Sequence, residues 1–561
     1  METNSFDAIV VGSGMSGGWA AKELTEKGLK TLVLERGRMV RHPDYPTATK
    51  DPWELPNANR ITQETRKRKP VQSRTGYPTP ANTHWFVDDL DHPYEEAQPF
   101  DWLRGYHVGG RSLMWARQSY RLSPLDFEGN AKEGWAIPWP VSYDEIAPWY
   151  DKAEIFAGIS GSKEGLGQLP DGQFLPPHDL NCVETEFKQR IGEKLGRKLI
   201  IGRCANLTAP LTHNESPQRG TCQARNMCIR GCPFGAYFSS VSATLPSAER
   251  TGNMTLKADQ IVHEIIYDNE KGKATGVRVI DANTGKQTDY FAKVIFMCAS
   301  AIGSAYIMLN STSSRFPNGF GNDSGELGHN IMDHNKPGNS SAQVEGHLDQ
   351  AYTGRRPNGF YIPRYQNVGK DKRGYLRGFG YQGRAQRLNF SRFNNSALIG
   401  DELKKAVREA GPWTIGMTAF GEILPYHENH MRLDRNKKDK HGLPTLVLDA
   451  VVRENERKME KDMVTDAAEM LEAAGYKNVT VRSDNFNVGN SIHEMGTARM
   501  GADPKKSVLN KFNQVHACKN VFVTDGSFMV SSACQNPSLT YMAFTARAAN
   551  HAVEELKKGN L

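Results

Sequence analysis

The sequence predicts an α/β protein whose first part is a doubly wound, mostly parallel sheet. Two apolar stretches, residues 7–11 and 30–35, have the composition of buried parallel strands. Residues 15–28 between them have the composition of a helix that ends at a glycine. A glycine-rich turn joins the first stretch to this helix. Strand, turn, helix and strand in this order form the β-α-β unit with which such sheets begin.

Length and composition restrict the class of protein. The chain has 561 residues, which at about 150 residues per domain allows two to four domains or two large interleaved ones. Hydrophobic residues make up 38% and charged residues 24%, and no apolar run is long enough to span a bilayer. The net charge of +7 comes from 70 basic and 63 acidic residues, and no long basic block concentrates it. We therefore expect neither disorder, nor nucleic-acid binding, nor direct membrane insertion.

The turn after the first strand, residues 12–17, is a complete G-x-G-x-x-G sequence. Gly12 makes the tight turn, Gly14 lets backbone approach a pyrophosphate, and Gly17 lets the helix pack on the strand. The helix N-terminus then offers free N–H groups and partial positive charge to the phosphates. Glu35 ends the second strand, where a carboxylate accepts hydrogen bonds from ribose hydroxyls. The alternative is a glycine-rich turn without a ligand, and the ligand itself is NAD or FAD.

The remaining elements follow in chain order. Residues 40–100 predict an extended excursion without strong periodicity, and residues 255–297 predict an antiparallel meander that returns to a buried strand at 294–297. Residues 330–450 are rich in strands and loops. Residues 455–474 predict an amphipathic helix that ends at Gly475, because its methionines and leucine recur on one stripe.

Two motifs near the C-terminus complete a recognisable pattern. Residues 493–501 read HEMGTARMG, and residues 521–540 contain VTDGS followed by NPSLT. With VVGSGMSGG near the start, VGGRSLMWA at 108–116, WPVSYDEIAPWYDKAE at 139–154 and MCASAIGSAYIMLNS at 297–311, the chain resembles the glucose-methanol-choline (GMC) oxidoreductase family over essentially its whole length.

The resemblance implies a GMC fold, in which a doubly wound FAD-binding domain is interleaved with an α+β substrate domain built on an antiparallel sheet. The FAD-binding domain is expected to comprise residues 1–150, 218–330 and 490–561. The substrate domain is expected to comprise residues 151–217 and 331–489.

The resemblance also implies site residues. His493 matches the family's catalytic histidine, and Asn536 matches its partner. Some relatives attach FAD covalently through a histidine at the position of Met114, so FAD is expected to bind non-covalently here; His107 lies nearby but out of register. The residues expected to contact FAD are Gly12, Ser13, Gly14, Ser16, Gly17, Glu35, Arg36, Gly109, Gly110, Ser112, Met114, Val262, Asp525, Gly526, Asn536 and Pro537.

The chemistry of alcohol oxidation explains why a histidine and an asparagine are expected together at 493 and 536. Oxidising an alcohol removes a proton from oxygen and a hydride from carbon. A neutral histidine takes the proton, an asparagine hydrogen-bonds the same hydroxyl without titrating, and the flavin N5 takes the hydride. An isolated histidine would more often be a buried core residue, but the motif favours the catalytic role.

Three of the eight cysteines, Cys222, Cys228 and Cys232, fall in the sequence C-x5-C-x3-C-P. Clustered thiolates suit an iron–sulfur cluster. A fourth thiolate is missing locally, which favours a three-iron cluster (3Fe-4S) unless Cys204 or Cys182 joins it. Zinc, a disulfide with one free thiol, and ordinary buried cysteines are the alternatives.

Within the family, this cysteine segment resembles the catalytic subunits of bacterial FAD sugar dehydrogenases, including glucoside 3-dehydrogenases, whose three-iron cluster passes electrons to a cytochrome-type acceptor. The favoured function is oxidation of a sugar hydroxyl, at C3 of glucosides or disaccharides. The alternatives are a glucose- or gluconate-type dehydrogenase acting at C1 or C2, a pyranose-type oxidase that uses O₂, and a catalytically silent flavin-binding assembly subunit. Trp102, Trp115 and Trp413 are candidates to stack on a sugar.

The chain starts without a basic segment followed by an apolar one, so no signal peptide is expected. Relatives of this kind work with a small companion subunit that carries the export signal. A periplasmic location by co-export is therefore expected, with the cytoplasm as the alternative.

Overall fold

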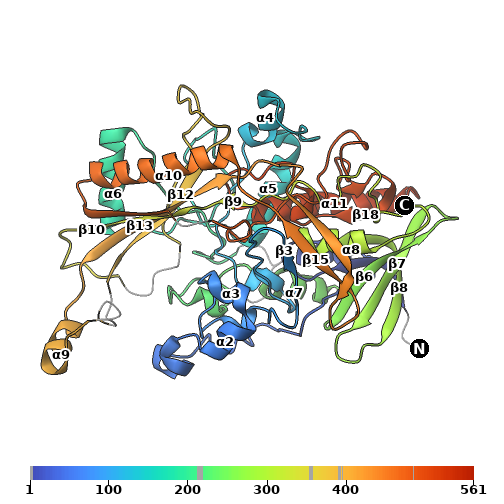
Figure 1. Cartoon of the computed structure of the whole chain (residues 1–561), viewed down its shortest axis with the longest axis horizontal. Coiled ribbons are helices and arrows are strands. Elements are labelled where there is room, and N and C mark those ends of the chain that lie inside the picture. Colours follow the sequence, from blue (N-terminus) through green and yellow to red (C-terminus); the bar gives the residue numbers. More distant parts are fainter. Residues whose placement is uncertain (1–3, 212–218, 353–357, 389–392, 394–395, 484–485) are drawn as a thin grey trace.

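The structure, a computed structural model, describes residues 4–211, 219–352, 358–388, 393, 396–483 and 486–561. Within these residues the chain forms an eight-stranded sheet, a seven-stranded sheet and a small three-stranded sheet, with helices around them. Figure 1 shows the first large sheet at one end of the molecule, where both termini lie, and the second large sheet at the other. The predicted α/β class is confirmed.

The core of the first sheet is parallel, with the strand order β18-β8-β1-β2-β5. Residues 8–11 of the central strand β1 are buried, as the continuous apolar run predicts. The bounds are β1 Ser5–Val11, β2 Thr31–Leu34, β5 Met254–Lys257, β8 Gln287–Met297 and β18 Cys518–Val523, with β17 Gln514–Val515 antiparallel at one edge.

Three helices pack together beside this sheet: α1 (Met15–Glu26), α5 (Tyr143–Ala157) and α11 (Ser538–Lys557). Trp19 of α1 is fully buried and meets Phe156 of α5 edge to face at 5.2 Å between ring centroids. Helix α1 therefore starts at the glycine-rich turn and is held against the sheet by a core that runs through both ends of the chain.

The expected meander at 255–297 is only partly antiparallel. Strands β6 (Gln260–Asp268) and β7 (Lys273–Asp281) pair antiparallel with each other, and β7 pairs antiparallel with β8. However, β5 lies parallel to β2. The reason is that β5 follows helix α7 (Thr244–Arg250), and a strand that follows a crossover helix returns parallel to its neighbour.

The second sheet is antiparallel, with the order β16-β10-β13-β12-β11-β4 and with β9 paired to β13. Helix α10 (Glu454–Ala473), at the predicted position, lies across this sheet beside α6 (Cys182–Leu195) (Figure 1). Its buried stripe includes the predicted Met459, Met463 and Met470. The strands are β4 Ile200–Ile201, β9 His334–Asn335, β10 Gly338–Val344, β11 Phe360–Ile362, β12 Phe379–Arg387, β13 Trp413–Glu422 and β16 Lys477–Ser483.

The third sheet joins distant parts of the chain. Strands β14 (His430–Lys438) and β15 (Pro444–Asp449) form a hairpin, and β15 pairs with β3 (Glu95–Glu96) of the 40–100 excursion. This pairing connects segments that the sequence assigns to different domains, and the predicted boundary at 217/218 lies outside the described residues. The domain boundaries stay a prediction. The other longer helices are α4 Pro124–Glu133, α8 Ala301–Asn310 and α9 Gly400–Arg408.

In the part of the chain that the structure describes, no helix combines the length and the apolar character that a membrane crossing requires.

Candidate active site

A cavity of about 940 Å³ opens between the carboxyl ends of the parallel strands and one face of the antiparallel sheet. Val11 and Leu34, the last residues of β1 and β2, line one end, while Gln382 of β12 and Thr418 of β13 line the other. Ligands of open parallel sheets bind at this edge. The cavity therefore connects the expected dinucleotide site to the expected substrate site.

The glycine-rich turn has the backbone that its spacing predicts. Gly12 has φ +98, and a Cβ at Gly17 would lie 1.9 Å from the Gly12 carbonyl oxygen. A Cβ at Gly14 would meet no described atom closer than 3.9 Å, so this position leaves space at the cavity. Helix α1 has no side-chain cap at its N-terminus. An uncapped N-terminus beside open space suits a phosphate group.

Glu35 lies buried at the end of β2 and lines the cavity. Its Oε2 accepts hydrogen bonds from Ser13 N (3.2 Å) and Ser13 Oγ (2.6 Å), and its Oε1 accepts one from Gly37 N (3.0 Å). Burial raises the pKa of Glu35, while these bonds oppose the rise. An ionised carboxylate has about four acceptor positions, so one remains for a ribose hydroxyl. These residues fit the nucleotide part of FAD.

Most of the expected cofactor residues meet around the cavity. Gly17 and Gly109 do not line it: Gly17 packs against the turn, and Gly109 occupies the left-handed region (φ +92), where its N–H reaches the Ser13 hydroxyl. The residues that line it are Gly12, Ser13, Gly14, Ser16, Glu35, Arg36, Gly110, Ser112, Met114, Val262, Asp525, Gly526, Asn536 and Pro537.

The expected catalytic pair faces the same cavity. His493 Nε2 and Asn536 Nδ2 lie 3.3 Å apart, although the residues are 43 positions apart in the chain. Gln382 of β12 donates from Nε2 to Asn536 Oδ1 at 2.6 Å. The antiparallel sheet therefore orients the amide that meets the imidazole. Sequence reasoning missed Gln382, because cross-sheet contacts leave no local pattern.

A second histidine, which sequence reasoning also missed, contacts the Nδ1 side of the His493 ring. His334, in β9, has its Nδ1 2.9 Å from His493 Nδ1 and its Nε2 3.3 Å from the carbonyl oxygen of Ser532. Burial lowers the pKa of His334 to about 4. Burial lowers the pKa of His493 well below its ordinary value, and His334, Arg111 and Lys336 lower it further. Both imidazoles are thus neutral at ordinary pH.

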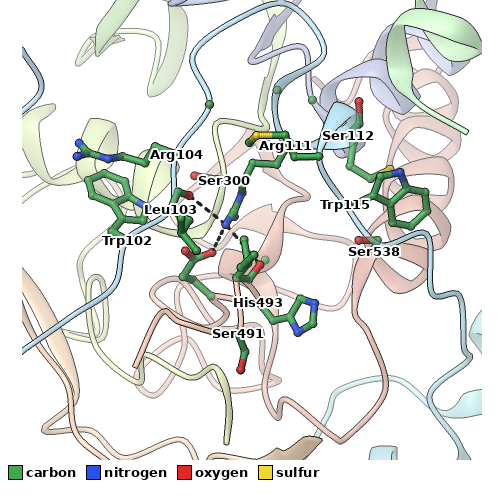
Figure 2. Close-up of a pocket in the computed structure, with 18 of the residues that line it drawn as sticks. Trp102, Leu103, Arg104, Arg111, Ser112, Trp115, Ser300, Ser491, His493 and Ser538 are labelled. Atoms are coloured by element: carbon green, nitrogen blue, oxygen red, sulfur yellow. Dashed lines mark hydrogen bonds and ion pairs between the residues drawn. The ribbon is translucent and has the colours of Figure 1, made fainter. Parts of the chain in front are cut away.

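A partly buried ion pair involves Glu494, the residue that follows His493. Arg111, between the expected FAD contacts Gly110 and Ser112, pairs with Glu494 (2.6 Å) and donates to the carbonyl of Leu103 (3.5 Å). Figure 2 shows the Arg111 side chain extending toward Leu103 and the 491–493 segment, while the His493 ring turns away from it. Arg111 lines the cavity and was not expected from the sequence.

The sheet face that closes the cavity is polar. Asn358 also lines the cavity, is 6% exposed, and has an Nδ2 without a hydrogen-bond partner in the described structure. Such a face suits a ligand with several hydroxyl groups. The polar residues of the face are Asn339, Ser341, Gln382, Arg384, Gln386, Thr414 and Thr418.

The three tryptophans predicted to stack on a sugar lie in different environments. Trp102 and Trp115 line the cavity, as the stacking prediction requires. Trp413 does not: it is 1% exposed, belongs to the core beneath α10, and donates from Nε1 to the His347 carbonyl at 2.9 Å. The prediction for Trp413 is wrong, because period-2 alternation turns this residue of β13 to the helix side of the sheet.

The cysteine segment forms a separate small site. Cys222, Cys228 and Cys232 line one cavity of about 20 Å³. Burial raises the pKa of Cys222 and Cys228, and the neighbouring thiols, including Cys204, raise it further. Among the described residues, no three His, Cys, Asp or Glu side chains are placed to hold a metal ion. The three thiols thus share a cavity without forming a ligand set, and the expected iron–sulfur cluster is not shown.

Comparison with known proteins decides the family. The N-terminal profile of GMC oxidoreductases matches residues 6–336, and the C-terminal profile matches residues 425–545. The chain belongs to the GMC oxidoreductase family. A 2-methyl-1,2-propanediol dehydrogenase of Mycolicibacterium austroafricanum is 28% identical, with 97% of this chain and 94% of that protein covered. The fructose dehydrogenase large subunit of Gluconobacter japonicus is 26% identical, with 100% and 99% covered.

Further relatives agree with this family. The gluconate 2-dehydrogenase flavoprotein of Pantoea cypripedii is 25% identical, with 99% of this chain and 95% of that protein covered. Among solved structures, pyridoxine 4-oxidase from Mesorbium loti matches with a TM-score of 0.63 at 16% identity, covering 97% of this chain and 98% of that one, which shows the shared fold.

The resemblance stated from the motifs is therefore confirmed at the level of the family, the fold and FAD as the cofactor. This GMC oxidoreductase is an FAD-dependent enzyme of the sugar or alcohol dehydrogenase type, acting on CH–OH groups. The glucoside 3-dehydrogenase type and the cluster are not established by these comparisons.

Proposed function

We propose that this GMC oxidoreductase oxidises a sugar hydroxyl to a ketone, with C3 of glucosides or disaccharides as the favoured position. The observation that carries the proposal is the His493–Asn536 pair, which faces a cavity closed by the polar side of the antiparallel sheet. The C3 assignment depends on the resemblance to glucoside 3-dehydrogenases, and C1 or C2 is the competing position.

The chain's own residues account for the proton. A substrate hydroxyl placed between His493 and Asn536 would donate to His493 Nε2 and accept from Asn536 Nδ2. His493 takes the proton because burial and the nearby cations keep the imidazole neutral at ordinary pH. FAD, when bound, supplies the acceptor for the hydrogen and electron pair that leave the carbon. The sheet orients the substrate carbon by hydrogen bonds to its other hydroxyls.

Substrate class is supported by the lining of the cavity. Asn339, Gln382 and Thr418 offer amides and a hydroxyl on one face, and Trp102 and Trp115 offer flat surfaces. Two relatives are named for dehydrogenation of fructose and of gluconate, which are polyhydroxylated. An aliphatic alcohol would leave this polar face without partners, at a cost in affinity.

The test is anaerobic reduction of the purified holoenzyme by a panel of glucosides, followed by NMR of the product. We expect bleaching of the flavin absorbance and a 3-keto sugar. His493→Gln should keep FAD but slow bleaching by about 10²–10⁴-fold, the usual contribution of a general base. Bleaching at the wild-type rate would remove His493 from the mechanism, and no bleaching by any sugar would favour a silent flavin-binding subunit.

We also propose that Cys222, Cys228 and Cys232 hold an iron–sulfur cluster, favoured as 3Fe-4S, which would supply a one-electron carrier. The support is that they line one cavity, and that Ile229, next to Cys228, also lines the large cavity. As the described side chains stand they are not placed to hold a metal, so cluster binding would have to draw the three thiols together. Since burial favours the neutral thiol, metal binding would have to displace the protons. Iron analysis and EPR test this: iron-free protein with a normal flavin spectrum would contradict it.

The proposed electron acceptor is a cytochrome-type protein rather than O₂. The surface beside the cysteines carries the half-exposed Ile229 and Phe234 together with Arg225 and Arg230, which suits an acidic partner with an apolar patch. Two relatives, from Streptomyces lividus and Streptomyces fradiae, are named as oxidases, so an oxidase is the second candidate. Peroxide release in air, compared with anaerobic dye reduction, separates the two.

A small companion subunit and a periplasmic location by co-export complete the proposal. One relative is named as a large subunit, which supports an assembly with a second chain. Expression with the neighbouring reading frames and isolation of the complex from periplasmic extract test both points. Full activity of the single chain confined to the cytoplasm would contradict them.

A further inference from the structure

We propose that His334 is a positioning residue: it holds the proton of His493 on Nδ1 and thereby leaves Nε2 bare toward the cavity. The inference rests on the proposed function, because it concerns which nitrogen of the base can accept a proton. It depends on a series of hydrogen-bond contacts that runs from the Ser532 carbonyl through His334 and His493 to Asn536.

Donor and acceptor are unambiguous at the Ser532 end of this series of contacts. The Ser532 carbonyl oxygen can only accept, so His334 Nε2, 3.3 Å away, is the donor and carries a proton. His334 is 0% exposed, and burial keeps its imidazole neutral. A neutral imidazole has one N–H, so His334 Nδ1 is left as an acceptor.

The contact between the two histidines then allows only one position for its proton. His334 Nδ1 and His493 Nδ1 are 2.9 Å apart, and two bare nitrogens at that distance would repel. His493 Nδ1 must therefore donate. Because His493 is also neutral, its Nε2 carries no proton and can accept.

The last contact agrees with this assignment. Asn536 Nδ2 can only donate, and it lies 3.3 Å from His493 Nε2. Gln382 Nε2 occupies Asn536 Oδ1, so the amide presents its nitrogen to the imidazole. Amide orientations alone are ambiguous, but the Ser532 carbonyl fixes the direction of the whole chain.

Among the described residues, the charged groups around the two rings do not supply a competing acceptor for His493 Nδ1. Arg111 and Lys336 are cations, and Asp333 accepts from the backbone N–H groups of both histidines. In the described structure His334 is the neighbour recorded for His493 Nδ1. Removing this acceptor would let the proton move to Nε2, where it blocks the base.

The experiment compares two variants of the holoenzyme. His334→Asn keeps an acceptor, since the Asn side-chain oxygen can take the place of Nδ1, whereas His334→Leu removes it. His263→Leu, at a buried histidine of β6 outside the site, is the matched control. FAD content is measured for each, so that loss of the fold is separated from loss of function.

The first readout is the ¹⁵N spectrum of protein labelled in histidine, with His493→Gln identifying the signals of residue 493. We expect the wild type and His334→Asn to show a protonated Nδ1 and a bare Nε2 at residue 493, and His334→Leu to show the proton on Nε2. A wild-type Nε2–H tautomer overturns the inference, even if His334→Leu does not fold.

The second readout is the rate of flavin reduction by the sugar. We expect His334→Leu to lose at least about 100-fold with FAD retained, because a wrong tautomer disables a general base. His334→Asn should recover most of that loss, and His263→Leu should change little. Equal rates in His334→Leu and the wild type overturn the inference. A Nδ1–H tautomer with no sugar oxidation would uphold the positioning role while the proposed function failed.

Discussion

Asp333 organises the backbone that carries the proposed base. Its Oδ1 accepts from His334 N (2.8 Å) and His493 N (3.1 Å), and its Oδ2 accepts from Gly489 N (2.8 Å) and Ser491 N (3.1 Å). One buried carboxylate thus ties both histidines and the preceding loop together. Burial, and then Glu494, raise the pKa of Asp333 to about 7, although these N–H groups oppose the rise.

Replacing Asp333 by Asn should be severe. The amide NH₂ would face two backbone N–H donors, which then lose their acceptor at about 1–3 kcal/mol each. We expect the free energy of unfolding to fall by a few kcal/mol at pH 8, where Asp333 is ionised, and flavin reduction to slow. Urea unfolding and stopped-flow reduction measure the two effects.

The control for this substitution is Asp268→Asn. Asp268 is half-buried, and its Oδ1 accepts from Glu270 N and Lys271 N, so an Asn oxygen can replace it there. Its Oδ2 also pairs with Lys271 Nζ at 3.0 Å, and such a surface ion pair contributes little to stability. Its unfolding free energy should change by less than about 0.5 kcal/mol. If Asp333→Asn behaves like this control, the four-bond arrangement does not position the loop.

At the scale of elements, two glycines in the turn between β1 and α1 differ in the space that the protein leaves for a side chain. Gly17 is needed for packing, because a Cβ there would collide with the Gly12 carbonyl. A Cβ at Gly14 would meet nothing closer than 3.9 Å in the protein, so packing does not require a glycine there. The motif predicts the FAD pyrophosphate at this position, which gives the two glycines different expected roles.

Gly14→Ala should fold normally yet bind FAD more weakly, since the methyl group occupies space at the helix N-terminus where the pyrophosphate is expected. We expect a near-native unfolding midpoint for the apoprotein and an increase in the FAD dissociation constant of at least about tenfold, measured by flavin fluorescence. Gly167→Ala, where a Cβ meets nothing within 4 Å, is the control. Unchanged affinity in Gly14→Ala would place the pyrophosphate elsewhere.

At the scale of the whole molecule, the fold buries histidines whose titration makes the free energy of unfolding depend on pH. Burial lowers the pKa of His107 and of His334 to about 4 each. In the unfolded chain both would titrate near 6.5. Between these values the unfolded state binds protons that the native state does not. The contribution of these histidines to the free energy of unfolding is therefore fully present above pH 6.5 and is lost as the pH is lowered toward 4.

We predict that His107→Gln reduces this acid sensitivity. Removing one such group should lower the slope of unfolding free energy against pH, between pH 6 and 4.5, by up to about 1.4 kcal/mol per unit. Urea unfolding across this range provides the slope. Equal slopes for His107→Gln and wild type would contradict the prediction.

The sequence by itself determined the β-α-β unit, the acid at residue 35, helix α10 and the family. These depend on short-range rules: turn chemistry, apolar periodicity and motif spacing act within a few residues. The same rules could not show that β5 would return parallel to β2, because the direction of a strand depends on the crossover that precedes it.

Only the tertiary structure decided how the site is completed. His334 and His493 are 159 positions apart, and Gln382 and Asn536 are 154 apart. Sheet register and the loop tied to Asp333 bring them together, and neither leaves a local pattern in the sequence. The same holds for Trp413, whose side of the sheet is set by strand register and by the helix that covers it.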